Sequence, residues 1–119
     1  MDRPTGTGAG GMIRARGGKI WCMYRHIVLL NLKPDTTDAQ RDAIFDRLRA
    51  LPAQIDALAE YLVGPDLGWA DDNAEIGIVA RFASRDDFET YRDHPAHLAV
   101  ITDVILPVIE SRRAIQFEE

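Results

Sequence analysis

The chain has a single cysteine, Cys22, so it cannot form an internal disulfide, and it has no Cys/His spacing typical of a zinc site. No apolar run approaches the roughly 20 residues that a membrane-spanning helix needs, so we expect no membrane partner. The 119 residues are enough for one domain and leave little room for a second. We therefore expect a small domain without a bound metal, in a reducing, cytoplasmic compartment.

Positive charge is scarce in most of the chain. Residues 1–22 carry a net charge of +3, so residues 23–119 carry −8 within a formal net charge of −5. Affinity for nucleic acids comes largely from contacts of Lys and Arg with phosphates. We therefore expect no nucleic-acid partner, and we interpret the acidic side chains as charges that solvate the helix faces.

The start of the chain differs in composition from the remainder. Residues 1–19 are rich in glycine and have little apolar periodicity, so they cannot bury enough surface to offset their ordering entropy. Met23 stands immediately before the first regular element, which leaves open whether residues 1–22 form an extension or precede a later start. We predict a flexible N-terminal extension over residues 1–22 and a folded domain over residues 23–119.

The apolar patterns predict six elements in the order βαββαβ. Four segments have the runs or alternation of strands: 24–33, 58–64, 75–83 and 112–118. A helix of about 13–14 residues is predicted between a capping box at Thr37 and Pro52. A second helical region begins after Ser84 and is split at Pro95, where His94 is expected to cap the second part. This order predicts an α+β, ferredoxin-like fold with a four-stranded antiparallel sheet and helices on one face.

Two expectations follow for the side chains. The last helix should direct Leu98, Ile101 and Val108 inward, together with Val104 or Ile105. The helix-free face of the sheet should carry five apolar side chains: Ile27, Leu29, Leu62, Val79 and Ile115. Because monomers rarely expose such a patch, we predict a homodimer through this face. The alternative is that the N-terminal residues fold back over it.

Four segments stand out beyond their periodicity: His26-Ile27-Val28-Leu29 in the first strand, Val63-Gly64, residues 81–97 and residues 107–111. Together they resemble the stress-responsive dimeric α/β-barrel (Dabb) family. The most specific part of the resemblance is the Tyr-x-x-His-Pro-x-His segment from Tyr91 to His97. The resemblance implies a homodimer in which two four-stranded sheets pack face to face as a barrel.

The resemblance also suggests site residues. The family includes plant stress-associated proteins and a polyketide cyclase that closes a ring by aldol condensation without a cofactor, so no cofactor is expected. In that cyclase a first-strand histidine, a tyrosine and a second histidine surround the substrate, and they correspond to His26, Tyr91 and His97. The last strand of the cyclase also supplies an aspartate, where this chain has Gln116. A neutral amide can hydrogen-bond an imidazole but cannot stabilise its charged form by ion pairing.

The residues leave three functions open, and with them the question of whether the protein is an enzyme. The first is a stress-response homodimer of unassigned reaction that binds a small apolar or aromatic ligand between sheet and helices. The expected lining of that pocket is Val28, Leu30, Phe45, Leu48, Tyr61, Ile78, Phe82 and Val100. The second is a cofactor-independent, polyketide-cyclase-like enzyme with His97 as base, Tyr91 as hydrogen-bond donor to an enolate oxygen and His26 as orienter. The third is a structural protein whose dimer stability is its function.

Overall fold

The computed structural model describes residues 13–16 and 19–119, and the side chains from Cys22 onward. Its elements, in chain order, are β1 (Ile13–Arg16), β2 (Lys19–Trp21), β3 (Tyr24–Leu32), α1 (Asp38–Arg49), a 3-10 turn (Leu51–Ala53), β4 (Glu60–Pro65), β5 (Ile76–Phe82), α2 (Arg85–Asp93), α3 (Pro95–Val100), a π-helical turn (Ile101–Ile105) and β6 (Ile109–Glu118). No helix in this part of the chain is long and apolar enough to cross a membrane.

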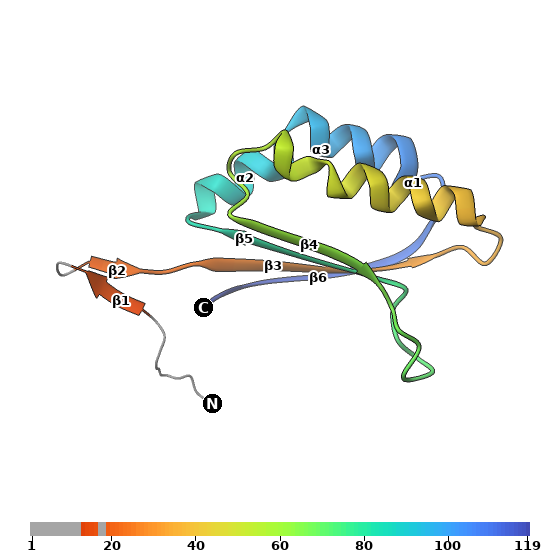
Figure 1. Ribbon diagram of the computed structural model, residues 1–119, viewed down its shortest axis with the longest axis horizontal. Helices are drawn as coiled ribbons and strands as arrows, with labels where there is room; N and C mark the ends of the chain where they lie inside the picture. The colour runs from red at the N-terminus through yellow and green to blue at the C-terminus, as the bar shows by residue number, and fades with distance from the viewer. Residues whose placement is uncertain (1–12, 17–18) are drawn as a thin grey trace.

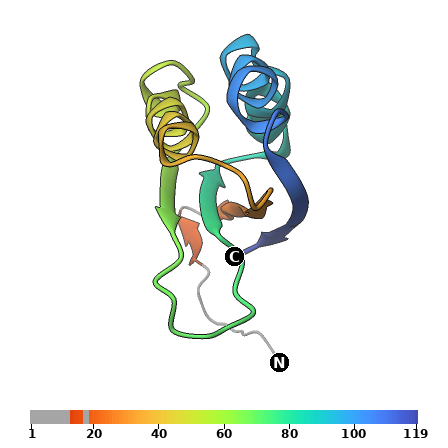
Figure 2. The same cartoon turned by 90° about the vertical axis from the view of Figure 1, so that its right-hand side faces the viewer.

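The main sheet has the strand order β4-β5-β3-β6, and every neighbouring pair is antiparallel. α1 and the α2–α3 region lie side by side over one face of this sheet, while the loop between β4 and β5 projects from the other (Figures 1 and 2). The predicted ferredoxin-like α+β fold is thereby confirmed. Residues 1–12 and 17–18 of the expected extension lie outside the described residues, and β1 pairs with β2 in a separate two-stranded sheet.

Each helix begins at the residue that the sequence indicates. At α1 the Gln40 amide N–H donates to the Thr37 hydroxyl at 3.1 Å, and the Thr37 amide N–H donates to the Gln40 side chain at 2.8 Å. At α2 the Asp87 amide donates to the Ser84 hydroxyl at 3.0 Å. At α3 Pro95 is the first helical residue, and Nδ1 of His94 accepts from the Ala96 amide at 3.0 Å. The capping role predicted for His94 is confirmed.

The core lies between the sheet and the helices. Side chains along β3 and β5 alternate between buried and less buried positions, because successive residues of a strand point to opposite faces. The fully buried centre consists of Phe82, Ile44, Leu48, Leu51, Ile55 and Val100. Rings of Phe88 and Tyr91, from α2, pack on Phe82 at centroid distances of 5.7 and 5.4 Å.

The last helix departs from the expected inward face. Leu98 was predicted to point inward, but it is 48% exposed, and Val100 is buried instead. The helix changes to a π-helical turn at residues 101–105, so Val100 and Ile105, five positions apart, both face the core. The prediction of Leu98 assumed a regular spacing of 3.6 residues per turn, and the wider turn explains why it is wrong.

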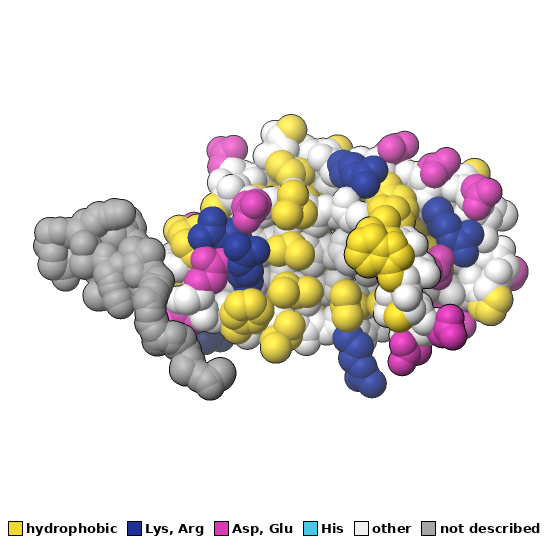
Figure 3. Space-filling view, turned by 60° about the horizontal axis from the view of Figure 1, so that its bottom comes forward, with side chains coloured by type: hydrophobic (Ala, Val, Ile, Leu, Met, Phe, Trp, Pro, Cys, Tyr) yellow, Lys and Arg dark blue, Asp and Glu magenta, His cyan; other side chains and the backbone are white. Residues whose placement is uncertain are grey.

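The helix-free face of the sheet carries a row of apolar side chains. Leu62, Val79, Ile27 and Ile115 occupy matching positions on β4, β5, β3 and β6, so they follow one another across all four strands. Leu62 and Ile115 are each 56% exposed, and Leu29 beside this row is 44% exposed. In Figure 3, which looks at this side of the molecule, apolar side chains gather over the middle of the sheet.

Candidate functional site

The three residues suggested by the family resemblance meet at one cavity. His26 comes from β3, Tyr91 from α2 and His97 from α3. The ring centroids of Tyr91 and His97 are 4.2 Å apart, and those of His26 and Tyr91 are 6.2 Å apart. The cavity has a volume of about 290 Å³. It lies between the sheet and the C-terminal helical region, so side chains from distant parts of the chain line it.

The cavity contains half of the lining residues expected from sequence. Val28, Leu30, Leu48 and Ile78 line it. Phe45, Tyr61, Phe82 and Val100 are not among its lining residues: Phe82 and Val100 are buried in the core, and Phe45 and Tyr61 pack against that core from partly buried positions. The remaining lining residues are Phe88, Arg92, Ile101, Ile105, Leu106, Ile109, Arg112 and Gln116.

His26 is a buried imidazole that presents a hydrogen-bond donor. In the orientation that the structure gives the amide, Nε2 of Gln116 donates to Nδ1 of His26 at 2.9 Å. A neutral imidazole carries one hydrogen, which must then be on Nε2 of His26. Burial, followed by the electrostatic interactions with Arg112 and with His97, lowers the pKa of His26 from its ordinary 6.5 to about 4. His26 is therefore neutral at pH 7.

His97 has the opposite arrangement of its ring nitrogens. Its Nδ1 lies 3.0 Å from the carbonyl oxygen of Arg92, which can only accept, so Nδ1 donates and Nε2 of the neutral ring keeps a lone pair. Burial lowers the pKa of His97, and the charge of Arg112 acts in the same direction, against the effect of the Arg92 hydrogen bond. The site therefore combines one imidazole with a free acceptor nitrogen and one with an N–H donor.

Tyr91 is held between the two histidines. Its hydroxyl lies 3.3 Å from the hydroxyl of Tyr61 on β4, within hydrogen-bond distance. Burial raises the pKa of both phenols, so each keeps its proton at neutral pH. A protonated phenol in a site of low polarity can donate a hydrogen bond to a carbonyl or enolate oxygen.

Two polar lining residues of β6 were not assigned to the site from sequence. The sequence marks Gln116 only as a departure from the cyclase and gives Arg112 no role. On β6, Gln116 pairs with His26 and Arg112 pairs with Leu30, both on the helix-covered face. The signal was available: residues 112, 114 and 116 share one face of a strand, so placing Gln116 beside His26 also directs Arg112 toward the cavity.

Neither His94 nor a metal cluster belongs to this cavity. His94 is not among the lining residues, since its ring caps α3. Within residues 13–16 and 19–119, no three side chains of His, Cys, Asp and Glu stand close enough together to hold a metal ion.

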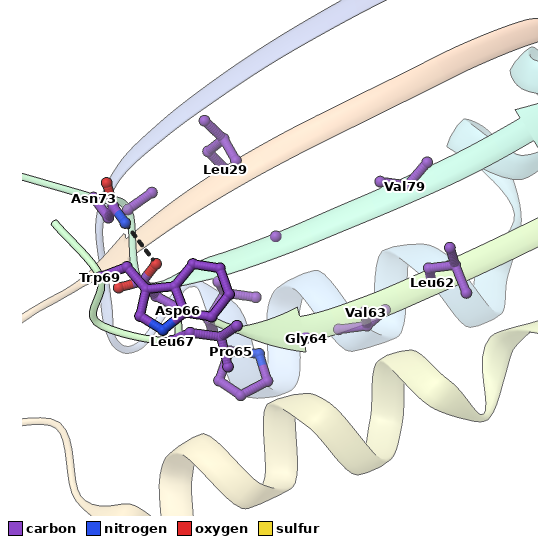
Figure 4. A pocket seen from close by; sticks show the side chains of 13 residues that line it. Leu29, Leu62, Val63, Gly64, Pro65, Asp66, Leu67, Trp69, Asn73 and Val79 are labelled. Carbon is purple, nitrogen blue, oxygen red and sulfur yellow. Dashed lines mark hydrogen bonds between the residues drawn. The ribbon is translucent and has the colours of Figure 1, made fainter.

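A larger hollow, of about 650 Å³, lies on the opposite, helix-free face. Gly64 and Gly77 pair across β4 and β5 at its floor, and a Cβ at either position would meet no atom within 4 Å. Figure 4 shows Leu29, Val79 and Leu62 on three neighbouring strands, with Trp69 in the loop at one end of the hollow. Trp69 is 86% exposed. Among the residues that the structure describes, Asp66 is the one titratable residue that lines this hollow, whereas the cavity on the covered side is lined by His26, Tyr91 and His97.

The fold and the cavity define a ferredoxin-like α+β protein whose polar groups converge between sheet and helices. A family model described as the stress responsive A/B barrel domain matches residues 24–119. The chain therefore belongs to the stress responsive A/B barrel domain (Dabb) family. The similarity covers every element from β3 to β6, including all of the residues that line the cavity.

Individual relatives agree with this assignment. A stress-response A/B barrel domain-containing protein of Arabidopsis thaliana is 26% identical over 96 residues, which are 80% of this chain and 36% of that protein. The chain thus spans about a third of that relative's length. A dimeric ferredoxin-like protein of unknown function from Thermobifida fusca is 36% identical, with a TM-score of 0.75 over 81% of this chain and 90% of that one.

Similarity of fold does not assign a reaction. The hydroxynitrile lyase of Passiflora edulis is 23% identical and has a TM-score of 0.72 over 82% of this chain and 93% of its own. At this identity the similarity shows a shared fold and nothing of the chemistry, since one fold hosts many functions. The reaction of this member of the family is therefore unassigned, and the chemistry of its site is the guide to it.

Proposed function

We propose that this protein binds a small molecule with an apolar or aromatic body in the cavity between sheet and helices. The observation that carries the proposal is the convergence of His26, Tyr91 and His97 on one cavity of about 290 Å³. A cavity of about 150 Å³ is large enough for benzene, so this one has room for a substituted ring. Apolar side chains cover most of the wall, and the polar groups cluster where they can orient one end of a ligand.

A pair of tryptophan substitutions on neighbouring residues tests this proposal. Ile101 lines the cavity, whereas Thr102, the next residue, is exposed and does not. Phenylacetamide and phenylacetate are suitable probes because each combines a benzene ring with a small polar end. We expect binding of at least one probe, measured by calorimetry or by NMR shifts of the histidine rings, to be lost in Ile101→Trp and retained in Thr102→Trp. Absence of binding of both to the unmodified protein would overturn the proposal.

A homodimer through the helix-free face is also part of the proposed function. The row of Leu62, Val79, Ile27 and Ile115 is apolar and exposed at its two ends, and a second copy of the same face would cover it. The relative from Thermobifida fusca is dimeric, which supports a homodimer. We propose a folded unit of residues 23–119 and a cytoplasmic location, because a single cysteine suits a reducing compartment.

A second candidate function is cofactor-independent aldol cyclisation, favoured by the hydrogen-bond arrangement of His97. Its Nε2 lone pair can take a proton from a carbon beside a carbonyl, and the resulting enolate oxygen can accept a hydrogen bond from Tyr91. The enolate carbon then attacks a second carbonyl of the same molecule, forming the carbon–carbon bond, and the new alkoxide takes the proton back from His97. His26 orients the substrate through its Nε2 hydrogen.

Variants of two histidines in the same segment test this candidate. With a poly-β-keto substrate, His97→Ala should lower the rate of cyclisation by about 10²–10⁴-fold, which is the usual contribution of a general base. His94→Asn keeps a side-chain oxygen that can cap α3 and should leave the rate unchanged. Tyr91→Phe should lower the rate less than His97→Ala, since the ring packing is retained. If His97→Ala lowers only the melting temperature, His97 is a core residue and the enzymatic candidate fails.

A further inference from the structure

The cavity is positively charged although the protein as a whole is acidic. Two arginines, Arg92 and Arg112, are among its lining residues, and no Asp or Glu is. Arg92 is neutralised by Asp93, with two N–O distances of 2.9 Å. Arg112 has no hydrogen bond or ion pair to a carboxylate within the part of the chain that the structure describes. No carboxylate among the described residues therefore compensates its charge at the site where the three polar ring side chains meet.

The position of Arg112 suits contact with a ligand. It lies opposite Leu30 on the helix-covered face of β6, and its side chain is exposed although it lines the cavity, which places it where the cavity meets solvent. Its positive charge acts to lower the pKa of His26, of Tyr91 and of His97, so Arg112 is close enough to interact electrostatically with all three. The guanidinium and the three rings thus surround the same volume.

We propose that the ligand of this cavity is a carboxylate with an apolar or aromatic body, whose carboxylate pairs with Arg112 at the cavity mouth. This inference rests on the proposed ligand-binding function. The planar guanidinium matches a carboxylate with two parallel hydrogen bonds. The N–H of His26 and the hydroxyl of Tyr91 are further donors for oxygen atoms, while the apolar wall covers the body. A cationic ligand would meet an unpaired positive charge without a carboxylate to offset it.

Two probes of the same shape and different charge test the proposal. Phenylacetate and phenylacetamide differ in the charge of the polar end, and their affinities can be measured by calorimetry at pH 7.5. Because a hydrogen bond to a charged group contributes about 1.5–3 kcal/mol, phenylacetate should bind about tenfold or more tightly than phenylacetamide. Arg112→Gln should bring the two affinities to within about threefold of each other, and Arg112→Lys should restore part of the difference.

The neighbouring arginine provides the control. Arg113 pairs with Leu29 on the helix-free face, so Arg113→Gln removes the same charge from the chain on the other side of the sheet. It should leave the ratio of the two affinities unchanged. Equal binding of both probes to the unmodified protein, or equal effects of the two arginine substitutions, would overturn the carboxylate proposal while leaving the ligand-binding function in place. Absence of binding of both probes would overturn the ligand-binding function itself.

Discussion

The two faces of the β4-β5-β3-β6 sheet are built from the same kinds of residue but have different environments. On the covered face, Val28, Ile78 and Phe82 are buried beneath the helices. On the other face, Leu62 and Ile115 are more than half exposed. A sheet with apolar side chains on both faces needs a packing partner on each face. The helices of this chain pack on one face only. The comparison teaches that the uncovered face is the surface to which we assign the proposed dimer interface, and that the covered face holds the polar groups of the candidate site.

Both faces carry apolar side chains, but they differ in the polar groups that accompany them. The covered face holds His26 and Gln116, at matching positions on β3 and β6, next to Tyr91 and His97 from the helices. At one end of the helix-free face, Arg25 and Arg81 are paired with Glu119, with Arg81–Glu119 at 2.7 Å. Glu60 also lies 3.9 Å from Arg81, so two carboxylates balance the two guanidinium groups, and the cluster marks the edge of the apolar row rather than a reactive site.

The largest expected effect comes from placing a charge in the apolar row. Val79→Asp should weaken the homodimer by more than about 100-fold, because each dimer would bury two unpaired carboxylates and a buried unpaired charge costs about 3–5 kcal/mol. Sedimentation velocity at several concentrations measures this. Leu98→Asp is the matched control: Leu98 is also an apolar residue, but it lies exposed on α3, and the substitution should leave the dimer intact. If the Val79→Asp variant formed an unchanged dimer, the interface would have to lie on another surface.

The next largest effect is expected on the covered face. Phe82→Ala should lower the free energy of unfolding by about 3–5 kcal/mol, because it leaves a cavity beneath α2 where the rings of Phe88 and Tyr91 now pack. Urea denaturation measures the change. Leu98→Ala, at an exposed position, should change the same quantity by no more than about 0.5 kcal/mol. Similar losses in both variants would contradict the assignment of Phe82 to the centre of the core.

The smallest expected effect is a pH dependence of stability, which His26 gives to the covered face. The pKa of His26 is about 4 in the folded protein and 6.5 in its ordinary state, so between these values the unfolded chain binds the proton and the folded one does not. The contribution of His26 to the stability of the folded protein is therefore complete above about pH 6.5, and it declines as the pH falls toward about 4. Melting temperatures of the protein and of His26→Gln across this range test the prediction.

The quantity to compare is the difference in melting temperature between the two proteins at each pH. The pH dependence of either protein alone also contains the titration of carboxylates, which takes place in the same range. His26→Gln should have the weaker dependence on pH, since it has no imidazole to protonate in the unfolded state. Parallel curves for the two proteins would contradict the buried, neutral state of His26. The helix-free face has no histidine in its apolar row, so its substitutions should leave this dependence unchanged.

Much of the fold could be predicted because local patterns and local structure agree. The capping box at Thr37 and the cap at Ser84 give the first residues of α1 and α2, and the alternation of residues 76–82 separates the faces of β5. The strand over 109–118 begins earlier than the predicted 112, because Ile109 is already paired with Leu32. A strand's ends depend on its partner, which a single sequence does not reveal.

The candidate site was partly predictable, for a related reason. His26, Tyr91 and His97 were proposed from a motif, whereas Arg112 depends on which residue of β6 faces which residue of β3. The misplacement of Leu98 has a different cause, since the π-helical turn at 101–105 changes the spacing along the helix. Of the eight predicted lining residues, Phe82 and Val100 do not line the cavity, because their side chains are buried in the core between sheet and helices.

By itself, the sequence determined the order of elements, the two apolar faces of the sheet and the identity of the polar groups, because these follow from periodicity, caps and residue type. The family resemblance suggested that Gln116 stands beside His26. Only the tertiary structure decided that the Gln116 amide donates to Nδ1 of His26, that Arg112 lines the same cavity, and that the Arg92 carbonyl leaves Nε2 of His97 as an acceptor. The physical reason is that these contacts depend on strand register and on how the helices pack. Gln116 and His26 are 90 positions apart in the chain, and no local pattern encodes which residue of one strand faces which residue of another.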